Sequence, residues 1–325
     1  MEKPRSLFSR PTFVGMWGYL FELYLRNALF SIVTAGIYSF WGKVAIRKYL
    51  WASFRLGGDG FTYHGTGKEL LKGFAKGMLV LLILNGGMSY VQRHIRSGGP
   101  GTGFYILGLG VLYIGFLTLV SLAIVGSWRY RLSRTTWRGI TFSFRGKTLD
   151  FVILFIQNAI LQLMTLGLFA PAAKMRSIGY RVSNSYFGNH AFQFRGRGKE
   201  LLPDFIVAVL ATPCTLGLVW FWYWALVKRY IWSRTRLGHL RFHMSVRGGE
   251  LLYLSATSWL AIIFTAGIAY PWVVKRRAQF FSERFFIHGN VEEVVFAQGK
   301  VEASPTGEGL SELLQIDSDF GFGMG

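Results

Sequence analysis

Cysteine and charge are both scarce in this chain. Its one cysteine, Cys214, lies in an apolar segment, which excludes an intrachain disulfide and a Cys-x-x-Cys metal site. Only 16% of the 325 residues are charged, against roughly 25% in soluble domains, and 51% are hydrophobic. Much of the surface must therefore face something other than water, and a membrane is the natural candidate.

Long apolar segments support this interpretation. A helix needs about 20 residues to cross the hydrocarbon core, and four segments exceed that length: 104–125, 151–173, 205–227 and 251–274. Two others are less uniform, because 17–40 carries Glu22 and Arg26 and 78–91 is short. We do not expect a cleaved signal peptide, since the first apolar segment contains charges and lacks a small-residue cleavage site. The sequence predicts a multi-pass membrane protein.

The positive charge lies beside the apolar segments. The chain carries 36 Lys and Arg against 16 Asp and Glu, a formal net charge of +20. These cations occupy short loops, which is the pattern expected for contact with anionic lipid headgroups and for control of topology. We therefore expect membrane lipids as partners and no nucleic acid. After Lys300 the chain becomes acidic and rich in glycine, which predicts a disordered tail.

The chain repeats itself with a period of 50 residues. An aromatic residue closes a basic cluster at this spacing, and a Thr-x-Gly begins at the same spacing. The aromatic residues are Tyr130, Tyr180, Tyr230 and Phe280, and the threonines are Thr165, Thr215 and Thr265. A first unit of the same layout contains Thr34, Gly36 and Tyr49; the interval from Tyr49 to Tyr130 exceeds one period by 31 residues, enough for one additional span near 73–103. A fixed period indicates one supersecondary unit used several times.

Each unit continues with a strand pattern and a glycine turn. Alternating apolar and polar residues predict half-buried strands. These strands are predicted at 61–63, 142–144, 192–194, 242–244 and 294–296. Turns such as Gly188-Asn189 precede most of them, so we expect short β-hairpins. A glycine turn followed by Glu-Leu-Leu then opens the next apolar helix, from Gly65, Gly196 and Gly248.

The predicted fold is a membrane α-helical protein with small β-hairpins, built from a module of a Thr-x-Gly-broken helix, a basic cluster and a hairpin. The predicted segments are a basic N-terminal segment (1–16), module 1 (17–73), an inserted span with its outer loop (74–103), module 2 with a full span (104–148), module 3 (149–201), module 4 (202–250), module 5 (251–300) and an acidic disordered tail (301–325). Because repeated modules leave terminal faces that need covering, we expect a homo-oligomer or a membrane-protein partner.

The run TAGIYSFWGKVAIRKYL, followed by GGDGFTYHGTGKELLKG, resembles the YjgN family of bacterial inner-membrane proteins, which is defined by a domain of unknown function. The resemblance covers nearly the whole chain to about Lys300. The matched positions are Thr34, Gly36, Trp41, Tyr49, Phe61, Tyr63, Gly65 and Gly67, and again Thr165, Gly167, Tyr180, Phe192, Phe194, Gly196 and Gly198. It departs at 170–172, which replaces a tryptophan, and at Gly115, which stands in place of a threonine. The resemblance implies an inner-membrane protein and brings no known activity.

Charge placement bears on whether the Thr-x-Gly segments cross the membrane. If all six apolar segments crossed once, the loops would place 16 Lys and Arg on one side and 18 on the other, without the usual positive-inside bias. If only the inserted span and 104–125 crossed, the counts would be 32 and 2. Bent backbone at membrane depth needs polar partners, which Thr hydroxyls and neighbouring modules would supply. Length alone favours crossing, but we favour the arrangement in which the Thr-x-Gly segments re-enter on one side.

This choice separates two functions. Basic hairpins gathered on the cytoplasmic face predict a membrane scaffold, or a platform that binds a partner or anionic lipid. Crossing segments would give adjacent modules opposite orientations, the inverted-repeat plan of transporters and channels with broken helices at mid-membrane. We favour the platform. The sequence presents no catalytic constellation, no metal-ligand cluster and no cofactor motif, so we do not expect an enzyme.

Two groups of residues are candidates for function. Cations beside glycines at a helix start favour an anion such as a lipid headgroup, and the candidates are Arg195, Arg197, Lys199 and Lys68. Polar groups inside apolar segments are often functional, and the candidates are Glu22, Arg26, Thr34, Thr165, Thr215 and Thr265. Solvated loop cations and a structural Glu22–Arg26 pair are the alternatives.

Overall fold

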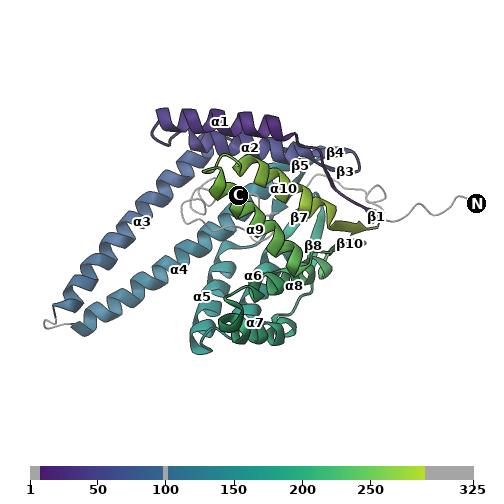
Figure 1. Ribbon diagram of the computed structural model, residues 1–325. Helices are drawn as coiled ribbons and strands as arrows, with labels where there is room; N and C mark the ends of the chain where they lie inside the picture. Colours follow the sequence, from purple (N-terminus) through teal and green to yellow (C-terminus); the bar gives the residue numbers. More distant parts are fainter. Residues whose placement is uncertain (1–7, 98–101, 290–325) are drawn as a thin grey trace, which may run out of the picture.

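Helices and strands alternate in pairs along the part of the chain that the structure, a computed structural model, describes, residues 8–97 and 102–289 (Figure 1). The helix pairs are α1 (Trp17–Val33) and α2 (Ser39–Ser53), α3 (Gly67–Arg96) and α4 (Thr102–Ser133), α5 (Thr148–Met164) and α6 (Ala170–Ser183), α7 (Leu202–Thr215) and α8 (Val219–Ser233), and α9 (Gly248–Phe264) and α10 (Tyr270–Glu283). A 3₁₀ helix, η1 (Gly198–Leu201), precedes α7. A strand or strand pair follows each helix pair.

The strands are short and mostly arranged as hairpins. They are β1 (Phe8–Ser9), β2 (Thr12–Phe13), β3 (Phe54–Leu56), β4 (Asp59–Tyr63), β5 (Thr135–Trp137), β6 (Ile140–Phe144), β7 (Ser185–Phe187), β8 (His190–Phe194), β9 (Thr235–Leu237), β10 (Leu240–Met244) and β11 (Phe285–His288). Two-residue turns join β3 to β4, β5 to β6, β7 to β8 and β9 to β10, and the first turn residue has a positive φ in each case, such as 58° at Gly188. Such turns match the twist of the flanking strands. The strands predicted at 61–63, 142–144, 192–194 and 242–244 are confirmed.

All eleven strands belong to one antiparallel sheet that the N-terminal segment closes. Its order is β1-β11-β10-β9-β8-β7-β6-β5-β4-β3-β2, so the two end strands, β1 and β2, are neighbours in the sequence. Ser9 lies opposite Ile287 at one end, and Thr12 lies opposite Arg55 at the other. Residues 8–13 therefore connect the last strand, β11, to the first hairpin, β3–β4, and the strands form a ring.

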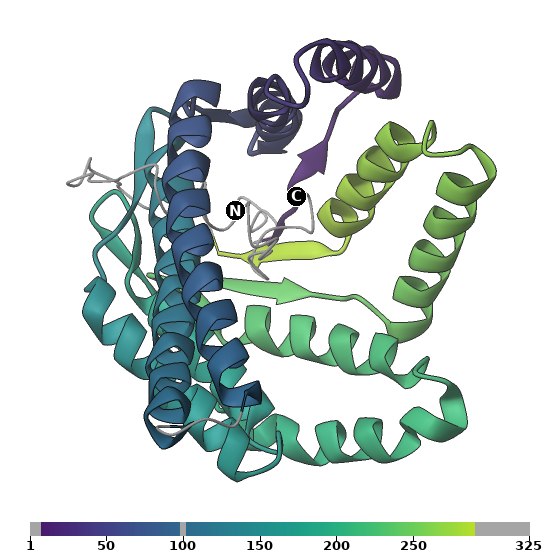
Figure 2. The same ribbon diagram turned by 90° about the vertical axis from the view of Figure 1, so that its left-hand side faces the viewer.

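The helix pairs surround this ring of strands. Figure 2 shows the pairs following one another around the molecule in sequence order. The first and last pairs also meet, because Leu20 and Leu50 pack in one cluster with Val274, and the rings of Tyr24 and Tyr270 lie 5.4 Å apart. The terminal modules thus cover each other. The reason given above for an oligomer does not hold, and the oligomeric state itself stays a prediction.

The concave side of the strand ring forms the main core. Alternate strand residues point inward, and they are large and apolar, including Trp137, Phe187 and Phe242. Helix residues such as Ala225 and Phe281 close the same cluster. The period-2 pattern of the hairpins therefore builds one core that the hairpins share, beside smaller clusters within and between the helix pairs.

The 31 residues in excess of the 50-residue period do not form the one added span that the sequence predicted. Helices α3 and α4 have 30 and 32 residues, against 14 to 17 in the other pairs, so the extra residues lengthen both partners. The predicted boundary between residues 73 and 74 falls inside α3, and Gly115 lies within an uninterrupted α4. The strand predicted at 294–296 and the tail predicted at 301–325 lie outside the described residues.

Candidate membrane interface

Two helices are long and apolar enough to cross a membrane among the residues described. They are α3, with a best-window mean hydropathy of 1.4, and α4, with 2.3. Their apolar faces are largely exposed, for example at Ile83 and Leu107. The other helices are too short for the same role, because 17 residues of α-helix extend about 25 Å and the hydrocarbon core is about 30 Å thick.

The four shorter pairs turn back at the Thr-x-Gly sequences. In each turn the residue after the threonine has a φ of 49° and the glycine that follows has a φ between 83° and 92°. The pairs of residues are Ala35 and Gly36, Leu166 and Gly167, Leu216 and Gly217, and Ala266 and Gly267. Two successive left-handed residues reverse the chain within five residues, and the second position favours glycine because it has no Cβ.

The threonine hydroxyl satisfies the backbone on both sides of each turn. In the turn after α5, Thr165 Oγ1 donates to the Leu161 carbonyl at 2.7 Å and accepts from the Phe169 N–H at 3.0 Å. Thr34, Thr215 and Thr265 make the same two contacts with residues four before and four after them. The carbonyl also accepts the threonine's own N–H, as at Leu161, where that distance is 3.0 Å. The hydroxyl's main contribution is therefore to the N–H at the start of the second helix, a group that a helix end leaves without a partner.

Buried asparagines hold two of these pairs together. Asn27 Nδ2 donates to the Gly42 carbonyl at 3.2 Å, and Asn158 Nδ2 donates to the Ala173 carbonyl at 3.3 Å. Each bond spans 15 residues centred on the turn, so the second helix runs back along the first. At Gly42 a Cβ would lie 2.9 Å from Asn27 Cγ, which explains the close approach of α1 and α2. Small residues and interhelical amide bonds are typical of helix contacts inside membranes.

The turns expose large apolar side chains. Leu166 is 94% exposed and Leu216 92%, while Val33 and Phe264, at the ends of α1 and α9, are 82% and 84% exposed. Full burial of a Leu, Val or Phe side chain is worth about 1.5–3 kcal/mol. We therefore define these four turns as the hairpin tips, and their surface is suited to hydrocarbon and poorly suited to water.

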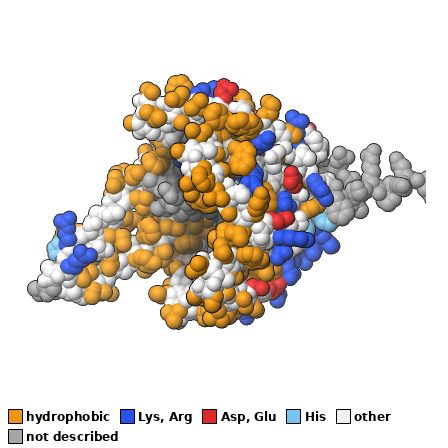
Figure 3. Space-filling view, viewed as in Figure 1, with side chains coloured by type: hydrophobic (Ala, Val, Ile, Leu, Met, Phe, Trp, Pro, Cys, Tyr) orange, Lys and Arg blue, Asp and Glu red, His pale blue; other side chains and the backbone are white. Residues whose placement is uncertain are grey.

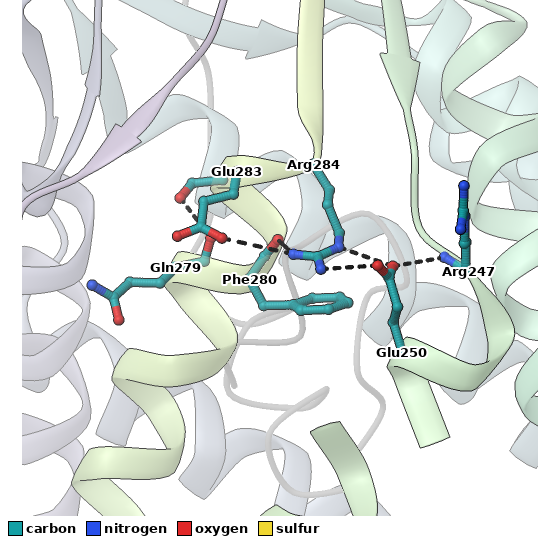
Figure 4. A network of polar contacts seen from close by, with 7 residues as sticks. Arg247, Glu250, Gln279, Phe280, Glu283 and Arg284 are labelled. Carbon is teal, nitrogen blue, oxygen red and sulfur yellow. Dashed lines mark hydrogen bonds and ion pairs between the residues drawn. The ribbon is translucent and has the colours of Figure 1, made fainter. Parts of the chain in front are cut away.

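In three helix pairs an Arg–Glu contact joins the start of the first helix to the end of the second. This contact lies at the end of the pair that is away from the turn. Arg284, at the end of α10, donates from Nε and Nη2 to the two oxygens of Glu250, at the start of α9, with both distances 3.0 Å (Figure 4). Arg234 contacts Glu200 at 2.7 Å, and Arg134 contacts Glu69. We call these contacts the base clamps. The hydrogen bonds from Arg284 hold the pKa of the Glu250 carboxyl below its usual value.

The sequence separation of the clamp residues can be compared between the long α3–α4 pair and the shorter pairs. The two clamp residues are 34 apart in sequence in the last two pairs and 65 apart in α3–α4, a difference of 31 residues. This equals the excess in the spacing of the aromatic residues. The α3–α4 pair therefore starts and ends at the sheet in the same way as the others and extends further away from it.

The glycine turns allow each helix pair to pack on the next. A Cβ on Gly198 would lie 2.1 Å from the Cα of Ala172, and one on Gly248 would lie 2.6 Å from the Cα of Trp222. Gly67 meets Trp41 in the same way, at 2.9 Å from its Cα. Contact between modules therefore explains the glycines at positions 67, 198 and 248.

The predicted anion-site cations do not form one cluster. Arg195, Arg197 and Lys199 are exposed alternate residues after β8, while exposed Lys68 begins α3 in another module. A 3₁₀ helix of four residues stands where we expected an α-helix N-terminus beside Lys199.

Glu22 and Arg26 are both exposed on α1, four residues apart. Among the described residues no ion pair joins their side chains, so the alternative of a structural pair gains no support. No group of three or more His, Cys, Asp or Glu within the described ranges is placed to hold a metal ion.

Lys and Arg gather at the strand end of the molecule. Figure 3 shows them over the end that carries the strands, with a smaller group at the far end of α3–α4 and apolar side chains between. On the outer side of the sheet, Arg236 of β9 and Arg241 of β10 lie directly opposite each other in register. Within the described part of the chain neither residue takes part in an ion pair. Facing like charges are unfavourable without a counter-ion, so this surface is suited to an anion.

Sequence reasoning did not single out Asn27 or the base clamps. The asparagines are polar residues inside apolar segments, at the same distance before Thr34 and Thr165, and that spacing is a signal that marks them. The clamp arginines follow the aromatic residues of the 50-residue period by four positions, and the clamp glutamates belong to the Glu-Leu-Leu motif. Both motifs were recognised, but their contact in space was not.

Comparisons with known proteins confirm the resemblance found in the sequence. A family model described as "Bacterial protein of unknown function (DUF898)" matches residues 9–213 and 198–313. The inner membrane protein YjgN of Salmonella typhimurium (strain LT2) is 31% identical over 133 residues, which cover 41% of this chain and 30% of that protein. The match therefore spans less than a third of that relative's length. No solved structure matches the chain.

Proposed function

This chain belongs to the DUF898 family of bacterial proteins, and on that premise we propose that it is a multi-pass inner-membrane scaffold with a basic binding platform on the cytoplasmic side. The relative named an inner membrane protein supports the location. We propose no enzymatic activity.

In the proposed topology, α3 and α4 cross the membrane and the four shorter pairs enter and leave through the cytoplasmic leaflet. Their lengths, their apolar tips and the Thr hydroxyls that satisfy the turn backbone support re-entry. The base clamps support it as well, because both ends of a clamped pair lie at the sheet. The 50-residue period then corresponds to one re-entrant helix pair with its hairpin.

The observation that carries the platform is the facing pair Arg236 and Arg241 on the outer side of the strand ring. The ring is rigid, because every strand is paired on both sides or joined through β1 and β2. It lies at the end away from the hairpin tips and carries most of the Lys and Arg in view (Figure 3). We propose that an anionic partner, in the first place the headgroup of an anionic lipid, binds this face.

The arrangement favours a platform over a transporter. Inverted repeats place alternate modules in opposite orientations around a site at mid-membrane. Here the helix pairs all start and end at the same sheet, which gives the modules one common orientation toward it. The hydroxyls at the Thr-x-Gly breaks are occupied by backbone groups and do not line a path for a solute.

Affinity isolation of the full chain in a mild detergent tests the platform. We expect the wild type to retain anionic phospholipid, and a variant with Arg236→Gln and Arg241→Gln to lose more than half of it. The matched control, Arg93→Gln with Arg96→Gln at the end of α3, should retain it. Equal retention by both double variants contradicts the platform. A pure protein without bound lipid that makes liposomes leak ions would favour transport instead.

A further inference from the structure

A cavity of about 320 Å³ lies on the concave side of the strand ring. Its wall is built by inward-pointing residues of successive hairpins, among them Trp137, Phe142, Phe187, Phe192 and Phe242. Neighbouring rings are close, with centroids 4.6 Å apart for Phe142 and Phe187 and 5.8 Å for Trp137 and Phe187. The wall is thus a nearly continuous aromatic surface.

The wall includes one charged residue, Arg131, and its three indole N–H groups are engaged in hydrogen bonds. The indole N–H of Trp51 donates to Thr135 Oγ1 at 3.1 Å, and that of Trp128 donates to Ser185 Oγ at 2.9 Å. The indole N–H of Trp137 donates to the Asp59 carbonyl at 3.3 Å. Most of the remaining wall is apolar, and apolar cavities accept apolar ligands.

The size of the cavity suits a ligand. It falls at the lower end of the range for ligand sites, roughly 300–1,000 Å³.

The cavity also adjoins a helix that is long and apolar enough to cross a membrane. Trp128 and Leu132, in the last turns of α4, are part of its wall. The hydrocarbon chains of lipids are the most abundant apolar ligands beside such a helix. We propose that the cavity binds one unbranched alkyl chain. This site is on the concave side of the sheet, so it is separate from the basic platform and does not depend on it.

Direct binding to the delipidated full chain tests this proposal. The protein would be held in digitonin, whose rigid steroid body lacks a flexible alkyl chain, and titrated with cis-parinaric acid, a fatty acid that fluoresces in apolar surroundings. A second titration would use a phosphatidylcholine that carries the same chain. Saturable binding of one probe per protein is expected in at least one titration, and the two titrations show whether the chain comes from a free acid or a phospholipid.

Variants that fill the cavity provide the decisive comparison. Leu237→Trp and Leu132→Phe each place extra volume in the wall, and each should weaken binding at least tenfold. The control Leu218→Trp, at an exposed position near a hairpin tip, should change it less than twofold. If Leu237→Trp does not fold, as judged by its thermal melt, Leu132→Phe decides. No saturable binding by the wild type, or equal binding by the filled variants, overturns the proposal.

Discussion

The guanidinium of Arg284 binds both carboxylate oxygens of Glu250 at 3.0 Å, although the two residues belong to opposite ends of a helix pair. The ring of Phe280 lies 3.9 Å beneath the guanidinium, and the Arg247 N–H donates to the same carboxylate at 3.1 Å. The contact therefore closes the base of the pair while the apolar turn lies at the other end. This relationship underlies our topology.

Loss of the Glu250 charge should weaken the fold in a pH-dependent way. The folded-state pKa of Glu250 is lowered, so its contribution is present above the unfolded value and is lost as the pH falls through the folded value. We expect Glu250→Gln to lower the free energy of unfolding by about 0.5–1 kcal/mol at pH 7, since the pair is partly exposed. Thermal melts between pH 7 and pH 3 should show the difference shrinking below the ordinary Glu pKa.

Glu283→Gln is the control for this experiment. Glu283 is exposed and lies 3.7 Å from the Arg284 Nη1 atom. Its loss should change the melting temperature little at any pH. A similar effect of both substitutions would show that the clamp has no special role.

Removal of a turn hydroxyl should destabilise its helix pair. Thr165→Val leaves the Phe169 N–H and the Leu161 carbonyl without the hydroxyl, and a lost hydrogen bond typically costs about 1 kcal/mol. For a protein of this size, a melting temperature lower by about 1–2 °C is expected in detergent. Thr118→Val removes a hydroxyl that only donates to the Ile114 carbonyl within α4 and should have less effect. Equal decreases in melting temperature for the two variants would show that the hydroxyl at the Thr-x-Gly turn has no special role.

Two adjacent glycines should respond in opposite ways to alanine. A Cβ on Gly248 meets the backbone of Trp222, whereas one on Gly249 meets nothing within 4 Å. We expect Gly248→Ala to destabilise by about 1–3 kcal/mol through overpacking, and Gly249→Ala to be neutral or stabilising by up to about 1 kcal/mol through helix propensity. Thermal melts of the two variants measure this directly, and a neutral Gly248→Ala would refute the packing between modules.

The sequence predicted the local structure well, but it did not predict that the strands close into one ring. The alternation at Phe242-His-Met244 predicts a strand because the pattern has the period of a strand, and the Thr-x-Gly at Thr165 marks a break because glycine supplies the positive φ. Neither pattern specifies which hairpins are neighbours. The one-sheet ring depends on residues 8–13, whose two-residue strands are too short to give a periodic signal.

The sequence predicted only part of the candidate site, because local patterns do not show which modules are neighbours. Thr34 and Thr165 were selected as polar residues in apolar segments, and the structure places them at the turns. Arg195 and Lys68 were grouped by similar motifs, but equivalent positions in different modules lie in different parts of a ring. The base clamps join residues 34 positions apart, beyond the reach of helical spacing.

Closure of the ring can be tested by a disulfide. Thr12 and Arg55 are register partners in β2 and β3, so Thr12→Cys with Arg55→Cys, in a Cys214→Ser background, should form an intramolecular disulfide on mild oxidation. Opposite residues in antiparallel strands have Cβ atoms about 4.5–5.5 Å apart. Thr12→Cys with Arg236→Cys should not form one. Non-reducing electrophoresis distinguishes the two, and failure of the first pair would contradict the closed sheet.

The side of the membrane on which the hairpin turns lie tests the account most directly. Single cysteines would replace Ser97, at the end of α3, and Asn189 and His239, in successive hairpin turns, in a Cys214→Ser background. A membrane-impermeant maleimide applied to intact spheroplasts should label the Ser97→Cys protein, and it should label the Asn189→Cys and His239→Cys proteins only after lysis. Labelling of Asn189→Cys and His239→Cys from opposite sides would contradict re-entry and support an inverted-repeat transporter.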